Sequence, residues 1–135
     1  MVCVDYIEGV FWKTISDQRQ KLGDLGEEIA SNYLKKKGYK ILERQYKSQY
    51  GEIDIIAEHK KTLVFVEVKA RRSDDFGLPE EAVDERKLEK IIATGNCYQQ
   101  KLKSKFEDVQ VDVVSIIINK EFQIKELKHL TDVWL

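Results

Sequence analysis

Two strand-like segments lie close together in the stretch GEIDIIAEHKKTLVFVEVKAR, which runs from Gly51 to Arg71. Residues 53–58 and 63–69 are rich in β-branched and aromatic side chains, and a short polar segment centred on Lys60 and Lys61 separates them. This pattern predicts an antiparallel β-hairpin. Side chains alternate between the two faces of a strand, so Glu67 and Lys69 share one face of the second segment.

The register of this hairpin decides where its charged residues meet. Pairing about the midpoint between residues 60 and 61 places Asp54 opposite Glu67 and Glu52 opposite Lys69. Directly opposed side chains have Cβ atoms about 5 Å apart. Three carboxylates and one ammonium then gather on one patch of an otherwise apolar hairpin, opposite the face expected for Ile53 and Ile55. A slip of one residue would send Asp54 and Glu67 to opposite faces, so the prediction requires an even register.

Two ionised carboxylates held face to face repel each other unless a cation lies between them. Oxygen ligands at this spacing suit Mg²⁺ or Mn²⁺, and a metal held by Asp54 and Glu67 would polarise a phosphate and activate a water molecule. Lys69 would orient that water or stabilise the developing charge. The alternative is a cross-strand ion pair on a solvated face, worth about 0.2 to 1 kcal/mol. The spacing alone leaves both interpretations open.

The rest of the chain supplies helices and further strands. A helical apolar stripe begins at Leu22 and stops before Gly38, and a second helix is expected from Pro79 to about residue 104, broken or restarted near Asp84 and weakened by Gly95. Further strands are expected at residues 40–47, 111–118 and 122–127, with a docked tail at 130–135. The order α-β-β-β-α-β-β predicts an α/β fold. Its third and fourth strands should be parallel, in a mixed central β-sheet flanked by helices.

Composition sets the class of protein. The 135 residues, 42% of them apolar, suffice for one domain, expected at residues 21–135 after an N-terminal extension of unclear role at residues 1–20. A net charge of −1 gives no overall argument for nucleic-acid binding, but residues 35–48 and 86–105 each hold six basic residues against one acidic residue. Cys3 and Cys97 form no CxxC pair, and no apolar run reaches the about 20 residues needed to span a bilayer. We therefore expect a cytoplasmic protein without a membrane segment.

The combination of Asp54 with Glu67-Val68-Lys69 resembles the D…(D/E)xK core of the PD-(D/E)xK nucleases, with Ile53 in place of the usual proline. The wider stretch from Gly23 to Val114 resembles the UPF0102 (YraN-like) family, which is similar to archaeal Holliday junction resolvases. The segments that carry this resemblance are GEIDIIAEHKKTLVFVEVKAR, GEEIA at 26–30, LPEEAV at 78–83, Lys87 and the VDVV strand from Val111. Ala70 departs from it, because Thr is common there, and so does His59-Lys60, where Asp-Gly is frequent.

The resemblance implies a restriction-endonuclease-like fold and a metal-dependent endonuclease that uses Mg²⁺ or Mn²⁺. It also implies DNA as the substrate, with branched DNA such as Holliday junctions preferred, and a homodimer that cuts two strands. One rival function is a nucleic-acid-binding module of the same fold that does not cleave. A second is a partner-binding domain in which the hairpin charges form only ion pairs.

The family's helical glutamate corresponds to Glu27. Glu27 shares a helical row with Ala30 and Leu34 beside the apolar stripe, whereas Glu28 lies on the solvated side. The expected catalytic set is Asp54, Glu67, Lys69 and Glu27, with Asp54, Glu67 and Glu27 as metal ligands and Glu52 as a supporting partner of Lys69. The residues expected to contact DNA are Arg71, Arg72, Lys87, Arg44 and Lys47.

Each supporting residue also has an ordinary structural explanation. Glu27 would interact favourably with the helix dipole, Lys87 would extend its stem along apolar surface, and Arg71 would be a solvated arginine. Asp112 is expected to cap a loop at the start of a buried strand. His59 is expected in a turn, with His129 too remote in the sequence to suggest a shared metal site.

Overall fold

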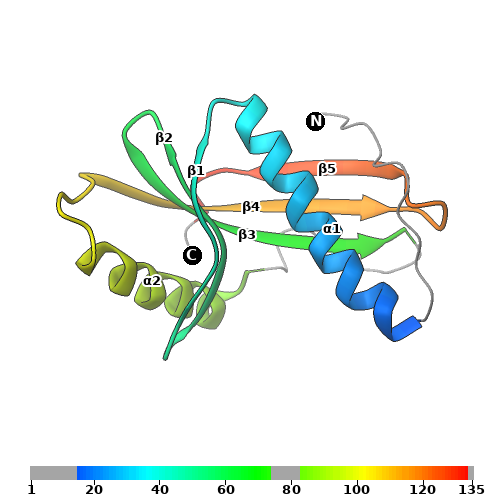
Figure 1. The fold of residues 1–135 in the computed structure, drawn as a ribbon, viewed down its shortest axis with the longest axis horizontal. Helices are drawn as coiled ribbons and strands as arrows, with labels where there is room; N and C mark the ends of the chain where they lie inside the picture. The colour runs from blue at the N-terminus through cyan, green and yellow to red at the C-terminus, as the bar shows by residue number, and fades with distance from the viewer. Residues whose placement is uncertain (1–14, 74–82, 134–135) are drawn as a thin grey trace.

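A computed structural model describes residues 15–73 and 83–133 of the chain. The elements follow the predicted order α-β-β-β-α-β-β, which confirms the α/β fold (Figure 1). They are α1 (Ile15–Lys36), β1 (Lys40–Ser48), β2 (Gly51–His59), β3 (Thr62–Arg72), α2 (Glu85–Gln100), β4 (Asp108–Ile118) and β5 (Ile124–Leu130). In this part of the chain no helix is both long and apolar enough to cross a membrane.

The strands form one five-stranded mixed sheet in the order β1-β2-β3-β4-β5. β3 and β4 are parallel and the other neighbours are antiparallel, as predicted from the helix that links them. Neighbouring residues of β3 pack on opposite sides: Val64 and Val66 contact the apolar residues of α1, whereas Phe65 contacts those of α2. The sheet therefore lies between the two helices, with α1 crossing one face diagonally and α2 below the other (Figure 1).

The β2–β3 hairpin has the predicted register. Ile55 pairs with Val66 and His59 pairs with Thr62, so paired positions are symmetric about the midpoint between residues 60 and 61. Lys60 and Lys61 both have positive φ, at 49° and 67°. Two successive left-handed residues match the type I′ turn, whose twist suits a two-residue hairpin.

The hairpin opens into a fork before it reaches its charged residues. The β2–β3 ladder ends at Ile55–Val66, while β2 stays paired with β1 as far as Gly51. The predicted pairs of Asp54 with Glu67 and of Glu52 with Lys69 are therefore not part of the ladder. The expected common face of Ile53 and Ile55 was also wrong: Ile53 packs on the α2 side and Ile55 on the α1 side. The side-chain alternation breaks at Asp54, where β2 leaves β3.

Helix boundaries follow local signals where such signals exist. α1 ends as predicted before Gly38, whose φ of 90° suits glycine, and the N–H of Tyr39 closes the end by donating to the carbonyl of Leu34. α2 begins after Asp84, whose side chain accepts a hydrogen bond from the N–H of Lys87. The expected helix start at Pro79 lies outside the described residues.

α1 starts seven residues earlier than the apolar stripe predicts, at Ile15 rather than Leu22. The intervening residues include Gln18, Arg19 and Lys21, which are good helix formers, so the helix continues beyond its apolar face. It runs unbroken through residue 20, where the sequence placed the end of the N-terminal extension.

Two glycines let the helices approach the sheet closely. A methyl group added to Gly26 of α1 would meet the side chain of Ala70 on β3, and one added to Gly95 of α2 would overlap the ring of Phe65. Glycine has a low helix propensity, but at position 95 its lack of a side chain leaves room for the ring of Phe65. The close contact at Gly26 sets the neighbouring Glu27 against the sheet beside the fork.

Candidate functional site

The fork between β2 and β3 brings together the two carboxylates that the sequence singled out. One oxygen of Asp54, Oδ2, accepts a hydrogen bond of 2.8 Å from the backbone N–H of Val68, the residue after Glu67. Glu67 is buried, with 8% of its surface exposed, and Asp54 is partly buried. Asp54 reaches across the opening to β3, so the two acids lie together although their positions do not pair in the ladder.

Burial and mutual repulsion oppose ionisation of this pair. Burial raises the pKa of Asp54 to about 6, and the charges of Glu27 and Glu52 add to the effect, although the Val68 N–H partly offsets it. Burial, with the charge of Asp54 as the second cause, raises the pKa of Glu67 to about 7. Near neutral pH the two acids together hold less negative charge than two exposed carboxylates would. A cation at this point would stabilise their ionised forms.

One cation already lies at the site. The Nζ atom of Lys87, in the first turn of α2, lies 3.2 Å from Oε1 of Glu67. Lys87 lowers the pKa of both Asp54 and Glu67, and Lys69 lowers that of Glu67. Lys69 is exposed two residues further along β3. The sequence predicted that Lys87 contacts DNA. In the structure, Lys87 approaches the two carboxylates from α2, on the face of the sheet opposite α1.

Glu27 reaches the site from α1 and is held by two residues of β1. It is 6% exposed, and its Oε1 and Oε2 accept from Arg44 Nε at 3.3 Å and Gln45 Nε2 at 3.2 Å. Arg44 also donates to the exposed Glu28 at 3.0 Å. The predicted inward orientation of Glu27 and outward orientation of Glu28 agree with these contacts. Arg44 thus bridges Glu27 and Glu28 of α1, and its expected contact with DNA stays a prediction.

Gln45 is a site residue that the sequence analysis missed. It lies between the paired positions Arg44–Ile55 and Tyr46–Ile53, which puts it across from Asp54, and its φ is 50°. A non-glycine residue in the left-handed region is unusual within a strand, and such backbone is often found at functional sites. No local signal marks Gln45, because its role depends on the pairing of β1 with β2.

The remaining predicted residues lie around this centre. Glu52 is exposed and pairs in the ladder with Lys47 on β1 rather than with Lys69. Arg71 and Arg72 end β3, and the Nε atom of Arg71 is buried without a hydrogen-bond partner in the part of the chain that the structure describes. Their expected contacts with DNA stay predictions.

The carboxylates suit a hard divalent ion. Across residues 15–73 and 83–133, no three His, Cys, Asp or Glu side chains converge into a ready-made metal cluster. Mg²⁺, however, commonly binds through only one or two carboxylates, with water and substrate phosphate completing its coordination. Asp54 and Glu67 fit that donor set. Glu27, tied to Arg44 and Gln45, would act through water or by rearrangement.

A second polar cluster lies on the α1 side of the sheet, where the sequence suggested only a loop cap. Asp112 is fully buried, and its Oδ2 accepts from His129 Nε2 at 2.7 Å and from the hydroxyl of Tyr39 at 3.1 Å. Its Oδ1 accepts from Gln110 Nε2 and the Asp132 N–H. Although burial opposes ionisation, these hydrogen bonds lower the pKa of Asp112 overall. Asp112 ties β4 to β5 and to the end of α1.

Comparison with known proteins agrees with the sequence features of the site. Residues 26–116 match the model of the Uncharacterised protein family UPF0102, and this range contains Glu27, Asp54, Glu67, Lys69 and Lys87. A UPF0102 protein from Persephonella marina is 47% identical over 103 residues, covering 76% of this chain and 89% of the relative. One from Syntrophomonas wolfei is 48% identical over 99 residues, covering 73% and 86%. One from Caldanaerobacter subterraneus is 42% identical over 113 residues, covering 83% and 93%. The chain therefore belongs to the UPF0102 family.

Proposed function

We propose that the chain is a metal-dependent endonuclease that hydrolyses DNA phosphodiesters. The observation that carries this proposal is the pair of Asp54 and Glu67 at the fork, where a buried and a partly buried acid lie together and the charge of Asp54 opposes the ionisation of Glu67. A purely structural ion pair would not need two acids there. Lys69, exposed beside them, adds the third element of the D…(D/E)xK pattern.

Each residue has a distinct role in the proposed reaction. Asp54 and Glu67 would hold Mg²⁺ or Mn²⁺, which supplies polarisation of the scissile phosphate and a lowered pKa for a bound water. Lys69 would orient the attacking water or stabilise charge on the phosphate. Glu27 would hold a water molecule at the α1 side of the opening, oriented by Arg44 and Gln45.

We propose branched DNA, such as a four-way junction, as the preferred substrate, on the basis of the resemblance to the resolvases. Cutting two strands symmetrically requires two centres, so the active form would be a homodimer. The basic residues Arg71, Arg72 and Lys47 would contact flanking phosphates.

A non-cleaving nucleic-acid-binding module is the second candidate, and the contact of Lys87 with Glu67 favours it. An ammonium 3.2 Å from the carboxylate already supplies a positive charge at the place where a metal would bind. If that ion pair persisted with nucleic acid bound, the fork would be a structural element of a binding surface.

Calorimetric titration of Mg²⁺ and Mn²⁺ into the wild type and Asp54→Asn, with four-way-junction cleavage on the same samples, tests the proposal. We expect metal binding that Asp54→Asn abolishes, together with metal-dependent cleavage. Asp108→Asn, an exposed acid at the start of β4, is the control for loss of one charge. Binding of DNA without metal binding or cleavage would favour the second candidate, and no metal binding even with DNA present would overturn the endonuclease proposal.

A further inference from the structure

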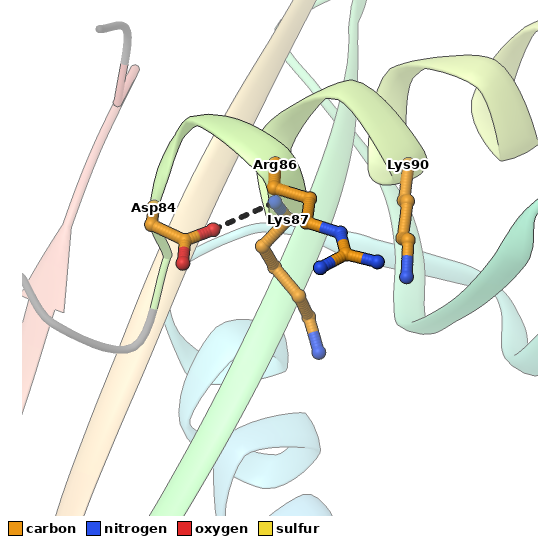
Figure 2. Close-up of a pocket in the computed structure, with 4 residues that line it drawn as sticks. All are labelled: Asp84, Arg86, Lys87 and Lys90. Atoms are coloured by element: carbon orange, nitrogen blue, oxygen red, sulfur yellow. Dashed lines mark hydrogen bonds between the residues drawn. The ribbon is translucent and has the colours of Figure 1, made fainter.

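A pocket of about 370 Å³ lies beside the first turns of α2, lined by Asp84, Arg86, Lys87 and Lys90 (Figure 2). Lys90 follows Lys87 by three residues and Arg86 by four, so its side chain shares a helix face with each of them. Figure 2 shows their charged ends pointing to the same side of α2. Neither Arg86 nor Lys90 was singled out by the sequence.

Among the described residues that line the pocket, three are basic and one is acidic. The carboxylate of Asp84 caps the helix by accepting from the Lys87 N–H at 2.8 Å. Within residues 15–73 and 83–133, the side chains of Arg86 and Lys90 form no ion pair or hydrogen bond. Like charges four residues apart in a helix repel each other. An anion in the pocket would turn this repulsion into attraction.

The pocket is continuous with the candidate centre through Lys87. This side chain lines the pocket, and its Nζ lies 3.2 Å from Glu67 Oε1. An anion beside Arg86 and Lys90 therefore lies next to the place where the scissile phosphate would bind. The β1–β2 turn also approaches here, since a Cβ on Gly51 would lie 3.6 Å from that of Lys90.

We propose that this pocket binds one backbone phosphate of the DNA strand that enters the fork, next to the phosphate that is cut. The inference rests on the proposed function for the identity of the ligand. Arginine and lysine at a phosphate position the strand without reading its bases. The pocket therefore sets the path of the strand along α2 in a sequence-independent way.

Fluorescence anisotropy of a labelled DNA duplex in EDTA, over a range of salt concentrations, tests this inference without cleavage. The variant Arg86→Gln/Lys90→Gln should bind about tenfold more weakly, and its slope of log affinity against log salt should be smaller by about 1, the value for one phosphate contact. The charge-retaining variant Arg86→Lys/Lys90→Arg should keep the wild-type slope. Lys120→Gln/Lys125→Gln removes two exposed charges at the β4–β5 turn, far from α2, and should change little (Figure 1).

The outcomes separate the pocket from the proposed function. An unchanged slope for Arg86→Gln/Lys90→Gln, or an equal loss in Lys120→Gln/Lys125→Gln, overturns the phosphate pocket even if the wild type cleaves DNA. The expected slope change in a protein that never cleaves supports the pocket and overturns only the endonuclease. Absence of DNA binding by the wild type in EDTA overturns the pocket, because its cations need no metal.

Discussion

An oxygen of Asp54 lies 2.8 Å from the backbone nitrogen of Val68, so the strand that carries Glu67 also fixes the acid that faces it. An asparagine at position 54 keeps an oxygen that accepts this hydrogen bond, while its charge is lost. Asp54→Asn therefore isolates the electrostatics of the pair from its structure.

The first prediction concerns stability against pH. Because the pKa values of Asp54 and Glu67 are raised to about 6 and about 7, the folded chain binds protons that the unfolded chain has released. Their contribution to the free energy of unfolding is fully present below about pH 4 and is lost as pH rises to about 7. As the pH rises from 5 to 8, the free energy of unfolding should fall by about 2 kcal/mol less in Asp54→Asn than in the wild type, as measured by urea titration. An identical loss in both proteins would contradict the raised pKa of Asp54.

The second prediction concerns competition for Glu67. The ammonium of Lys87 and a divalent ion would bind the same carboxylate, so Lys87→Met should strengthen Mg²⁺ binding by several-fold in calorimetry. The same variant should weaken DNA binding, because a phosphate contact is lost. Lys90→Met, which lacks the Glu67 contact, is the matched control and should leave Mg²⁺ affinity unchanged. Weaker Mg²⁺ binding by Lys87→Met would show that Lys87 supports the metal rather than competes with it.

The third prediction tests the hairpin turn. Lys60 and Lys61 both adopt left-handed backbone, which costs an ordinary residue about 1 kcal/mol. Replacing them with Asn-Gly, the preferred type I′ pair, should raise the free energy of unfolding by about 1 kcal/mol. The variant Lys60→Gln/Lys61→Gln removes the same charges without the turn preference and should show no such gain.

A fourth prediction compares two helical glycines by thermal unfolding. Alanine normally stabilises a helix by about 1 kcal/mol relative to glycine, and Gly23→Ala should do so because nothing lies within 4 Å of the added methyl group. Gly95→Ala should instead destabilise by about 1 to 3 kcal/mol, because its methyl group overlaps the Phe65 ring. Replacing that ring by the smaller side chain of leucine, in the double variant Gly95→Ala/Phe65→Leu, should recover part of the lost stability. Equal changes in stability for Gly23→Ala and Gly95→Ala would refute the close packing.

The fifth prediction concerns the buried carboxylate of Asp112. In the wild type, His129 and Tyr39 both donate hydrogen bonds to the carboxylate of Asp112. Asp112→Asn replaces one carboxylate oxygen with an NH₂ group, which cannot accept these bonds, and removes the negative charge. We therefore expect the free energy of unfolding to fall by about 3 kcal/mol. The lowered pKa of Asp112 means that its contribution is present above about pH 4 and lost as pH falls. Asp108→Asn, exposed on the same strand, should stay within about 0.5 kcal/mol of the wild type.

Features encoded locally were predictable from the sequence. The hairpin register follows from two apolar segments placed symmetrically about residues 60 and 61, and Gly38 and Asp84 mark helix ends through backbone preferences that need no tertiary context. The parallel β3–β4 pair follows from the handedness of a helical crossover. These elements place Asp54, Glu67 and Lys69 at one end of the same hairpin.

Features that depend on distant contacts were not predictable. The end of the β2–β3 ladder depends on how β1 holds β2, and the role of Gln45 depends on α1 placing Glu27 beside it. His129 and Asp112 belong to neighbouring strands, and their contact with Tyr39 appears only when the sheet and α1 assemble. The spacing of residues along the sequence does not show which of these distant residues come into contact.

Residues 51–54 of β2 form a two-stranded ribbon with β1, whereas residues 55–59 also pair with β3. Among the described residues, no third strand pairs with this ribbon. Its end is supported by α2, because the hydroxyls of Ser48 on β1 and Thr94 on α2 share a hydrogen bond of 2.9 Å. Short ribbons twist more strongly and open more readily than wide sheets. Amide hydrogen exchange should therefore be faster at the ribbon end than in β4. We therefore expect Asp54 to move more than Glu67, with the contact between α2 and the ribbon limiting how far the opening between the two acids widens.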